Sequence, residues 1–146
     1  MASQWAWALC EAPNSSATTA TEAIRVTGEA AKAIAKVLHA HFVKEEEYAL
    51  PPLGLLPALA YDNFERGMAD VLAMTDTLAA ELPQMLAEHK QIVAALEKLI
   101  AAAKAEQHSD VVTFAEKLML HALAEEQVAY PTALLIGRYV KARLAA

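Results

Sequence analysis

The stretch HFVKEEEYALPP, residues 41–52, and the stretch HALAEEQVAYP, residues 121–131, share the pattern H-x3-E-E-x2-A-x-P. In each stretch, a histidine precedes a glutamate by four residues. Residues four apart on an α-helix lie about 40° apart around the axis and about 6 Å apart along it, so the two side chains can reach the same point. The repeat therefore predicts two chelating pairs, His41 with Glu45 and His121 with Glu125.

The composition indicates an all-α protein. The chain has 146 residues, of which 56% are hydrophobic and 21% are charged, and it contains only 4 glycines. Its high content of alanine and leucine is typical of helical proteins. A chain of this length can bury roughly two thirds of its unfolded surface, which suffices for one core. We predict one domain, an up-down-up-down four-helix bundle over residues 18–146, after an irregular N-terminal arm at residues 1–17.

Capping residues and prolines set the expected bounds of four helices. Thr19 and Glu22 form a capping box that opens the first helix. Proline fits the first turn of a helix but disrupts its interior, because it lacks an N–H group and its ring clashes with the preceding turn. Pro83 is therefore expected to open the third helix, and Pro131 to kink or break the fourth. The expected helices cover residues 19–50, 57–77, 83–104 and 109 to near the C-terminus.

Three of these helices carry a histidine on an apolar stripe. On the last helix the stripe steps by four and three residues, the spacing of a buried seam. Its members are Phe114, Leu118, His121, Glu125, Val128, Thr132 and Leu135. Similar stripes hold His41 with Glu45 and, on the third helix, His89, and none of them contains lysine or arginine. A buried carboxylate needs a cation or a proton. We therefore expect His41, Glu45, His89, His121 and Glu125 to bind a metal.

For some other polar residues the sequence allows two roles, and others lie off the apolar stripes. Glu65, on the expected second helix, is either a sixth ligand or a surface carboxylate. Glu126 steps off the seam and is a candidate substitute ligand. Tyr48 follows Glu45 by about one turn and either donates a hydrogen bond to the site or is a partly buried aromatic residue. His39 and His108 are expected to face solvent.

Charge and composition exclude several classes of partner. The formal net charge is −6 and no basic stripe appears, which argues against nucleic-acid binding. The single cysteine, Cys10, excludes an intramolecular disulfide, and the N-terminus lacks a secretory signal, so we expect a cytoplasmic protein. No apolar run reaches the length of about eighteen residues that a membrane span needs. A homodimer with Trp5 and Trp7 in the contact is a candidate assembly.

On these motifs the chain resembles the hemerythrin-type HHE cation-binding domain family, over residues from about 20 to 140. The resemblance implies a four-helix bundle that holds a non-haem di-iron centre, in proteins that bind oxygen, sense oxygen or redox state, or respond to iron. It also implies that His41, His89 and His121 are terminal ligands and that Glu45 and Glu125 bridge the metals. The family usually places a further histidine on a preceding helix, and residues 1–38 contain none.

The donor set agrees with iron, although imidazole with carboxylate also suits zinc or manganese. Our leading hypothesis is a non-haem, two-iron protein that binds or senses dioxygen or a related small oxidant at a carboxylate-bridged site. One alternative is a metal-dependent oxidoreductase, peroxidase-like or NO-consuming, on the same site. Another is a metal-stabilised bundle for protein interaction. The sequence leaves open whether the protein is an enzyme.

Overall fold

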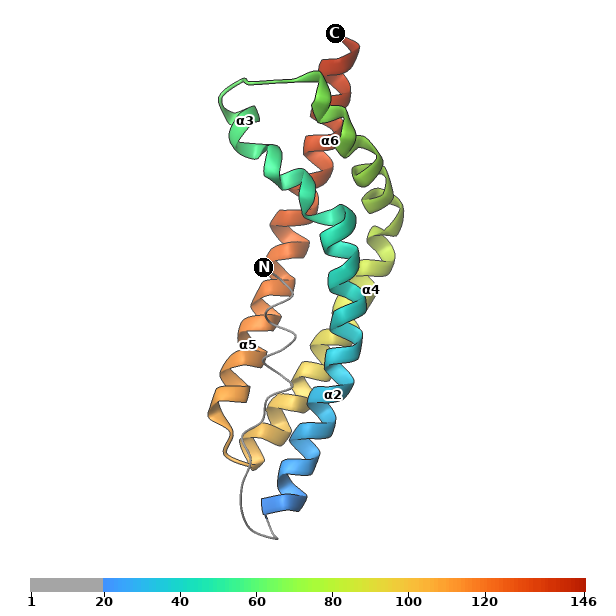
Figure 1. Ribbon diagram of the computed structural model, residues 1–146. Coiled ribbons are helices and arrows are strands. Elements are labelled where there is room, and N and C mark those ends of the chain that lie inside the picture. Colours follow the sequence, from blue (N-terminus) through green and yellow to red (C-terminus); the bar gives the residue numbers. More distant parts are fainter. Residues whose placement is uncertain (1–19) are drawn as a thin grey trace. The chain divides into compact units, whose positions relative to one another are not determined.

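The computed structural model describes the backbone of residues 20–146 and the side chains from residue 26 onward. Every regular element in this range is a helix, and the range contains no strand, so the all-α prediction is confirmed. The first long segment is α2 (Ala20–Lys44), which continues into the π-helix η1 (Glu45–Ala49). The second is α4 (Val71–Ala105), and the third joins α5 (Ser109–Ala124), the π-helix η4 (Glu125–Ala129) and α6 (Tyr130–Ala145) (Figure 1).

Three long segments do not confirm the predicted count of four helices. The helix expected over residues 57–77 is wrong, because most of this region consists of short elements. Residues 57–77 contain most of α3 (Leu56–Ala60), the 3-10 helix η3 (Arg66–Asp70) and the start of α4. The 3-10 helix η2 (Pro51–Leu55) precedes them. The chain leaves α3 at Asp62, whose φ of 54° is left-handed. The amide of Asn63 then bonds back to the Ala58 carbonyl, which ends the helix.

Pro83 lies inside α4 and does not open a helix as predicted. Its side chain is exposed. Buried residues continue on both sides of it at helical spacing, and they include Leu78, Met85, Ile92 and Leu99. Because this stripe packs on both sides of the proline, tertiary burial outweighs the cost of about 3 kcal/mol that an interior proline imposes.

The two π-helices occupy corresponding positions in the sequence repeat, each covering the five residues E-E-x2-A. In η1 the amide of Leu50 bonds to the Glu45 carbonyl, five residues back. In η4 the amide of Tyr130 bonds to the Glu125 carbonyl in the same way. A proline follows each bond, and its clash with the carbonyl four residues back favours the wider turn. The repeat therefore encodes a backbone feature as well as donor residues.

The described residues form two compact units. The first comprises residues 20–42 and Glu88–Ala122, and the second comprises Val43–Ala87 and Leu123–Ala146. The core of the first unit joins α2, α4 and α5 through Ile34, Leu38, Ile92, Leu96, Leu99 and Ala115.

The second unit has two clusters. One joins η1, α4 and α6 through Ala49, Leu78, Met85, Tyr130 and Ala133. The other joins α4 and α6 through Val71, Ile136 and Val140, and the short elements of residues 51–70 pack against it. The single domain predicted for residues 18–146 stays a prediction, and the N-terminal arm, with Trp5 and Trp7, lies outside the described residues. Within the described range, no helix combines the length and the apolar character that crossing a membrane would require.

Candidate metal centre

Two histidines of the first unit face each other. The Nε2 atoms of His41 on α2 and His89 on α4 are 2.7 Å apart, and the two rings are tilted by 59°. The side chains are only 2% and 1% exposed, respectively. On the other edge of its ring, His41 places Nδ1 2.9 Å from Oε2 of Glu88. We call these three residues, His41, Glu88 and His89, the imidazole half of the candidate centre.

The hydrogen bond to Glu88 determines which nitrogen of His41 carries the proton. An ionised carboxylate only accepts hydrogen bonds, so Nδ1 of His41 is the donor. In the neutral ring, Nε2 then presents a lone pair toward His89. Two imidazole nitrogens bound about 2.1 Å from one ion in adjacent octahedral positions would lie about 3 Å apart. The observed 2.7 Å is close to this separation, so the pair fits two ligands of one metal ion.

The second unit contributes carboxylates. The Tyr130 hydroxyl donates a hydrogen bond of 2.5 Å to Oε1 of Glu45. Glu45 is 1% exposed, Glu125 is 4% exposed, and Tyr130 is fully buried. Burial raises the pKa of Tyr130 far above its ordinary value, and the charges of Glu45, Glu125 and Glu126 raise it further. Tyr130 is therefore a neutral donor. We call Glu45, Glu125 and Tyr130 the carboxylate half.

The π-helix η4 gives Tyr130 its inward direction. In a regular α-helix, the residues on the same face as Glu125 would be Val128 and Ala129. Because η4 holds one extra residue per turn, Tyr130 takes the buried position, and Val128 is 62% exposed. The predicted seam is therefore wrong beyond Glu125, and Leu135 on that seam is likewise 63% exposed.

The structure separates the five predicted ligands into two sets. His41, Glu45, His89 and Glu125 are buried and make up a His/Glu group that could hold a metal ion. His121 is exposed, and its neighbour Ala122 is the buried residue. The prediction that His121 lies on a buried seam is therefore wrong, and its role as a ligand stays a prediction.

The structure also shows where the other polar residues singled out in the sequence lie. Glu65 is exposed and has an extended backbone with φ −124°, so it does not lie on the second helix that was predicted to carry it. His39 is exposed, as predicted. His108 lies in the turn after α4 and is half-buried, with Nε2 3.8 Å from Glu106 Oε2. Tyr48 packs against the apolar cluster around Ala49, which agrees with the prediction of a partly buried aromatic residue at this position.

Sequence reasoning missed two contacts of the centre, Glu88 and Tyr130. Glu88 directly precedes His89, but adjacent helical residues point about 100° apart, so the dipeptide gave no reason to pair Glu88 with His41. Tyr130 stands before the proline of the second repeat, and a regular helical period assigns it no place on the seam. A signal was present for Tyr130, because a proline six residues after the motif glutamate occurs in both repeats.

Comparison with known proteins supports a cation-binding role. The family model of the hemerythrin HHE cation-binding domain matches residues 8–133. No curated protein and no solved structure matches the chain. The family match spans most of the 146 residues and includes all four buried donors. The chain belongs to the hemerythrin HHE cation-binding domain family.

Proposed function

We propose that this protein holds iron at a non-haem, carboxylate-bridged centre and there binds or senses dioxygen or a related small oxidant. The observation that carries the proposal is the buried pair of Nε2 atoms of His41 and His89, 2.7 Å apart, with the His41 tautomer set by Glu88. Membership of a cation-binding family supports it independently. In the proposed centre, Glu45 and Glu125 complete the donor set.

The charge of the donor set suits a divalent cation. Two neutral imidazoles and two ionised carboxylates carry a total charge of about −2. Placing such carboxylates in a core is costly unless a cation or hydrogen bonds stabilise them. Imidazole and carboxylate together are the ligands of non-haem iron sites, and manganese and zinc bind similar sets. Iron and manganese, unlike zinc, also supply redox chemistry and open positions for an oxidant, and of the two the family resemblance implies iron.

The chain's own residues orient these donors. Glu88 accepts the Nδ1 hydrogen of His41 and so fixes the ring with Nε2 available. Tyr130 donates its hydroxyl hydrogen to Oε1 of Glu45 and restricts the rotation of that carboxylate. Since both contacts are formed by buried or half-buried side chains, water competes with them poorly. These contacts therefore hold Nε2 of His41 and the carboxylate of Glu45 in place before a metal binds.

Metal analysis of the purified protein, with optical spectra in the oxidised and reduced states, tests the proposal. We expect iron, and an absorption in the near ultraviolet and visible that changes on reduction. Reversible change on exposure to dioxygen would indicate binding or sensing, whereas turnover with an electron donor would indicate an oxidoreductase. Stoichiometric zinc without iron after expression in iron-replete medium would contradict the iron assignment.

Matched glutamate variants test the donor set. Glu125→Ala should sharply reduce bound metal, whereas Glu126→Ala, one residue and about 100° away on the helix, should reduce it much less. Circular dichroism must show that both variants keep their helices. Equal loss in the two variants would show that the register of this helix is wrong. Equal retention would show that Glu125 is a structural residue. His121→Ala is measured separately, because the exposed position of His121 predicts a smaller loss than His41→Ala gives.

A further inference from the structure

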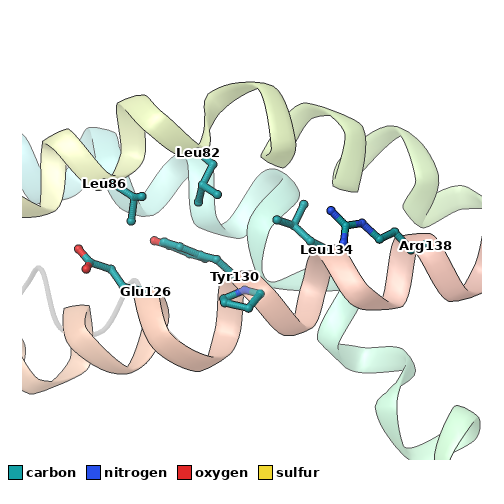
Figure 2. A pocket seen from close by; sticks show the side chains of 7 residues that line it. Leu82, Leu86, Glu126, Tyr130, Leu134 and Arg138 are labelled. Atoms are coloured by element: carbon teal, nitrogen blue, oxygen red, sulfur yellow. The ribbon is translucent and has the colours of Figure 1, made fainter.

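The second unit contains a half-open groove of about 280 Å³ between α4 and the helix formed by η4 and α6. Its lining is mostly apolar, and Figure 2 shows leucines from α4 and α6 around the Tyr130 ring. A charged residue lines the groove near each end, Glu126 at the Tyr130 end and Arg138 beyond Leu134. The lining residues are Leu82, Leu86, Glu126, Tyr130, Pro131, Leu134 and Arg138. The groove lies outside the proposed set of metal ligands.

Arg138 lies at one end of the groove and can bind an anion there. Within residues 26–146, no hydrogen bond or ion pair involves its guanidinium group, and its side chain is exposed. A guanidinium can bind a carboxylate through two parallel hydrogen bonds. By contrast, Glu126 makes the other end unfavourable for a second negative charge. The groove should therefore bind a ligand with one negative charge more tightly than a ligand with a negative charge at each end.

We propose that this groove binds an amphiphilic organic monoanion, with its carboxylate at Arg138 and its apolar body along Leu82, Leu86 and Leu134. The uncharged end of the ligand lies toward Tyr130. A volume of 280 Å³ corresponds to about nine water molecules, at about 30 Å³ each. A medium-chain carboxylate with about ten non-hydrogen atoms has this size. The proposal does not depend on the proposed metal function.

Calorimetric titration of the full chain with sodium octanoate tests this inference. Octanoate should bind, and hexanoate should bind more weakly, by up to about fourfold for each methylene removed from the apolar wall. Octan-1-ol, which lacks the charge, and octanedioate, which places a second carboxylate toward Glu126, should both bind more weakly than octanoate. Each titration is made with metal-free and with iron-loaded protein, since a carboxylate that binds only the loaded form would be binding the metal.

Two cation variants on α6 isolate the role of Arg138. Arg138→Gln should weaken octanoate binding about fivefold, as expected for an exposed ion pair with favourable geometry. Lys141→Gln makes the same change of charge one turn further along the helix, outside the groove, and should leave the affinity unchanged. Glu126→Gln should bring the affinity for octanedioate closer to that for octanoate.

Several outcomes would overturn the inference. These are no octanoate binding at millimolar concentration, equal affinities in the Arg138→Gln and Lys141→Gln variants, and octan-1-ol binding as tightly as octanoate. NMR adds an independent reading, because octanoate should shift the methyl signals of Leu82 and Leu134. Since metal-free protein is included, failure of the iron proposal would leave these results intact, and failure of octanoate binding would leave the iron proposal intact.

Discussion

Tyr130→Phe is the most direct test of how the carboxylate half is organised. The variant removes one oxygen atom and keeps the ring, which packs in the cluster with Ala49, Leu78, Met85 and Ala133. No large cavity forms, so the change isolates the hydroxyl group. That hydroxyl donates a 2.5 Å hydrogen bond to Oε1 of Glu45, and both side chains are buried.

The expected magnitude follows from the charge of the acceptor. A hydrogen bond to a charged group contributes about 1.5–3 kcal/mol, and burial places this bond toward the upper part of that range. The free energy of unfolding of metal-free protein should therefore fall by about 2–3 kcal/mol. Partners that orient a metal ligand typically change metal affinity by about 10- to 100-fold when they are lost. Tyr130→Phe should weaken metal binding within this range and leave the metal stoichiometry unchanged.

Two measurements check these values. Urea unfolding of metal-free protein gives the change in free energy, and competition with a chelator under anaerobic conditions gives the affinity for Fe²⁺. Tyr139→Phe is the matched control, because the Tyr139 hydroxyl accepts a 2.6 Å hydrogen bond from Arg143 in an exposed setting of the same unit. It should leave the affinity for Fe²⁺ unchanged.

The reasoning fails if Tyr130→Phe binds Fe²⁺ as tightly as the unaltered protein. An unchanged affinity with a loss of stability would show that Tyr130 supports the core without orienting a ligand. Equal weakening by Tyr139→Phe would show that the effect does not arise from the contact with Glu45.

Other predictions concern packing, metal removal and the remaining histidines. Gly137→Ala should destabilise the protein by about 1–3 kcal/mol in urea unfolding, because a Cβ there would overlap the Thr75 side chain. At Gly28 in α2 a Cβ would meet open space, so Gly28→Ala should instead stabilise the protein by about 0.5–1 kcal/mol. A change of stability in the same direction for both variants would contradict the packing argument. Removing the metal should lower the melting temperature and keep the helical circular dichroism signal, so loss of that signal would refute an independently stable core. Alanine at His39 or His108 should leave the metal stoichiometry unchanged, and a loss at either would place the site elsewhere.

Local periodicity made much of the centre predictable. His41 and Glu45 are one helical turn apart, and His89 lies on an apolar stripe, so the helical period alone indicated that these three are buried. The end of the first helix was also predictable, since Pro51 follows the helical segment that ends at Ala49, whereas the predicted capping box of Thr19 and Glu22 lies outside the described side chains. Each of these features depends on residues close together in the sequence.

The wrong predictions concern places where packing overrides a local signal. Pro83 is a strong local break, but apolar residues on both sides of it pack into cores and keep α4 continuous. Helix α3 ends just before Asp62, whose left-handed φ is a conformation that aspartate adopts more readily than most residues but does not require. Neither outcome can be read from propensity, because the energy that decides it comes from contacts with distant segments.

The sequence by itself determined that the chain is helical and that it carries a repeated pair of histidine and glutamate, because helical hydrogen bonds and side-chain periodicity are local. Only the tertiary structure decided which residues complete the centre. A single extra residue in η4 rotates the rest of the helix, so Tyr130 points inward and the expected seam fails beyond Glu125. At His121, which lies in the regular α5, the expected seam fails as well. Glu88 reaches His41 from another helix, and that contact depends on the packing of α4 against α2. Contacts between segments distant in the sequence set both positions, and a local period contains no information about them.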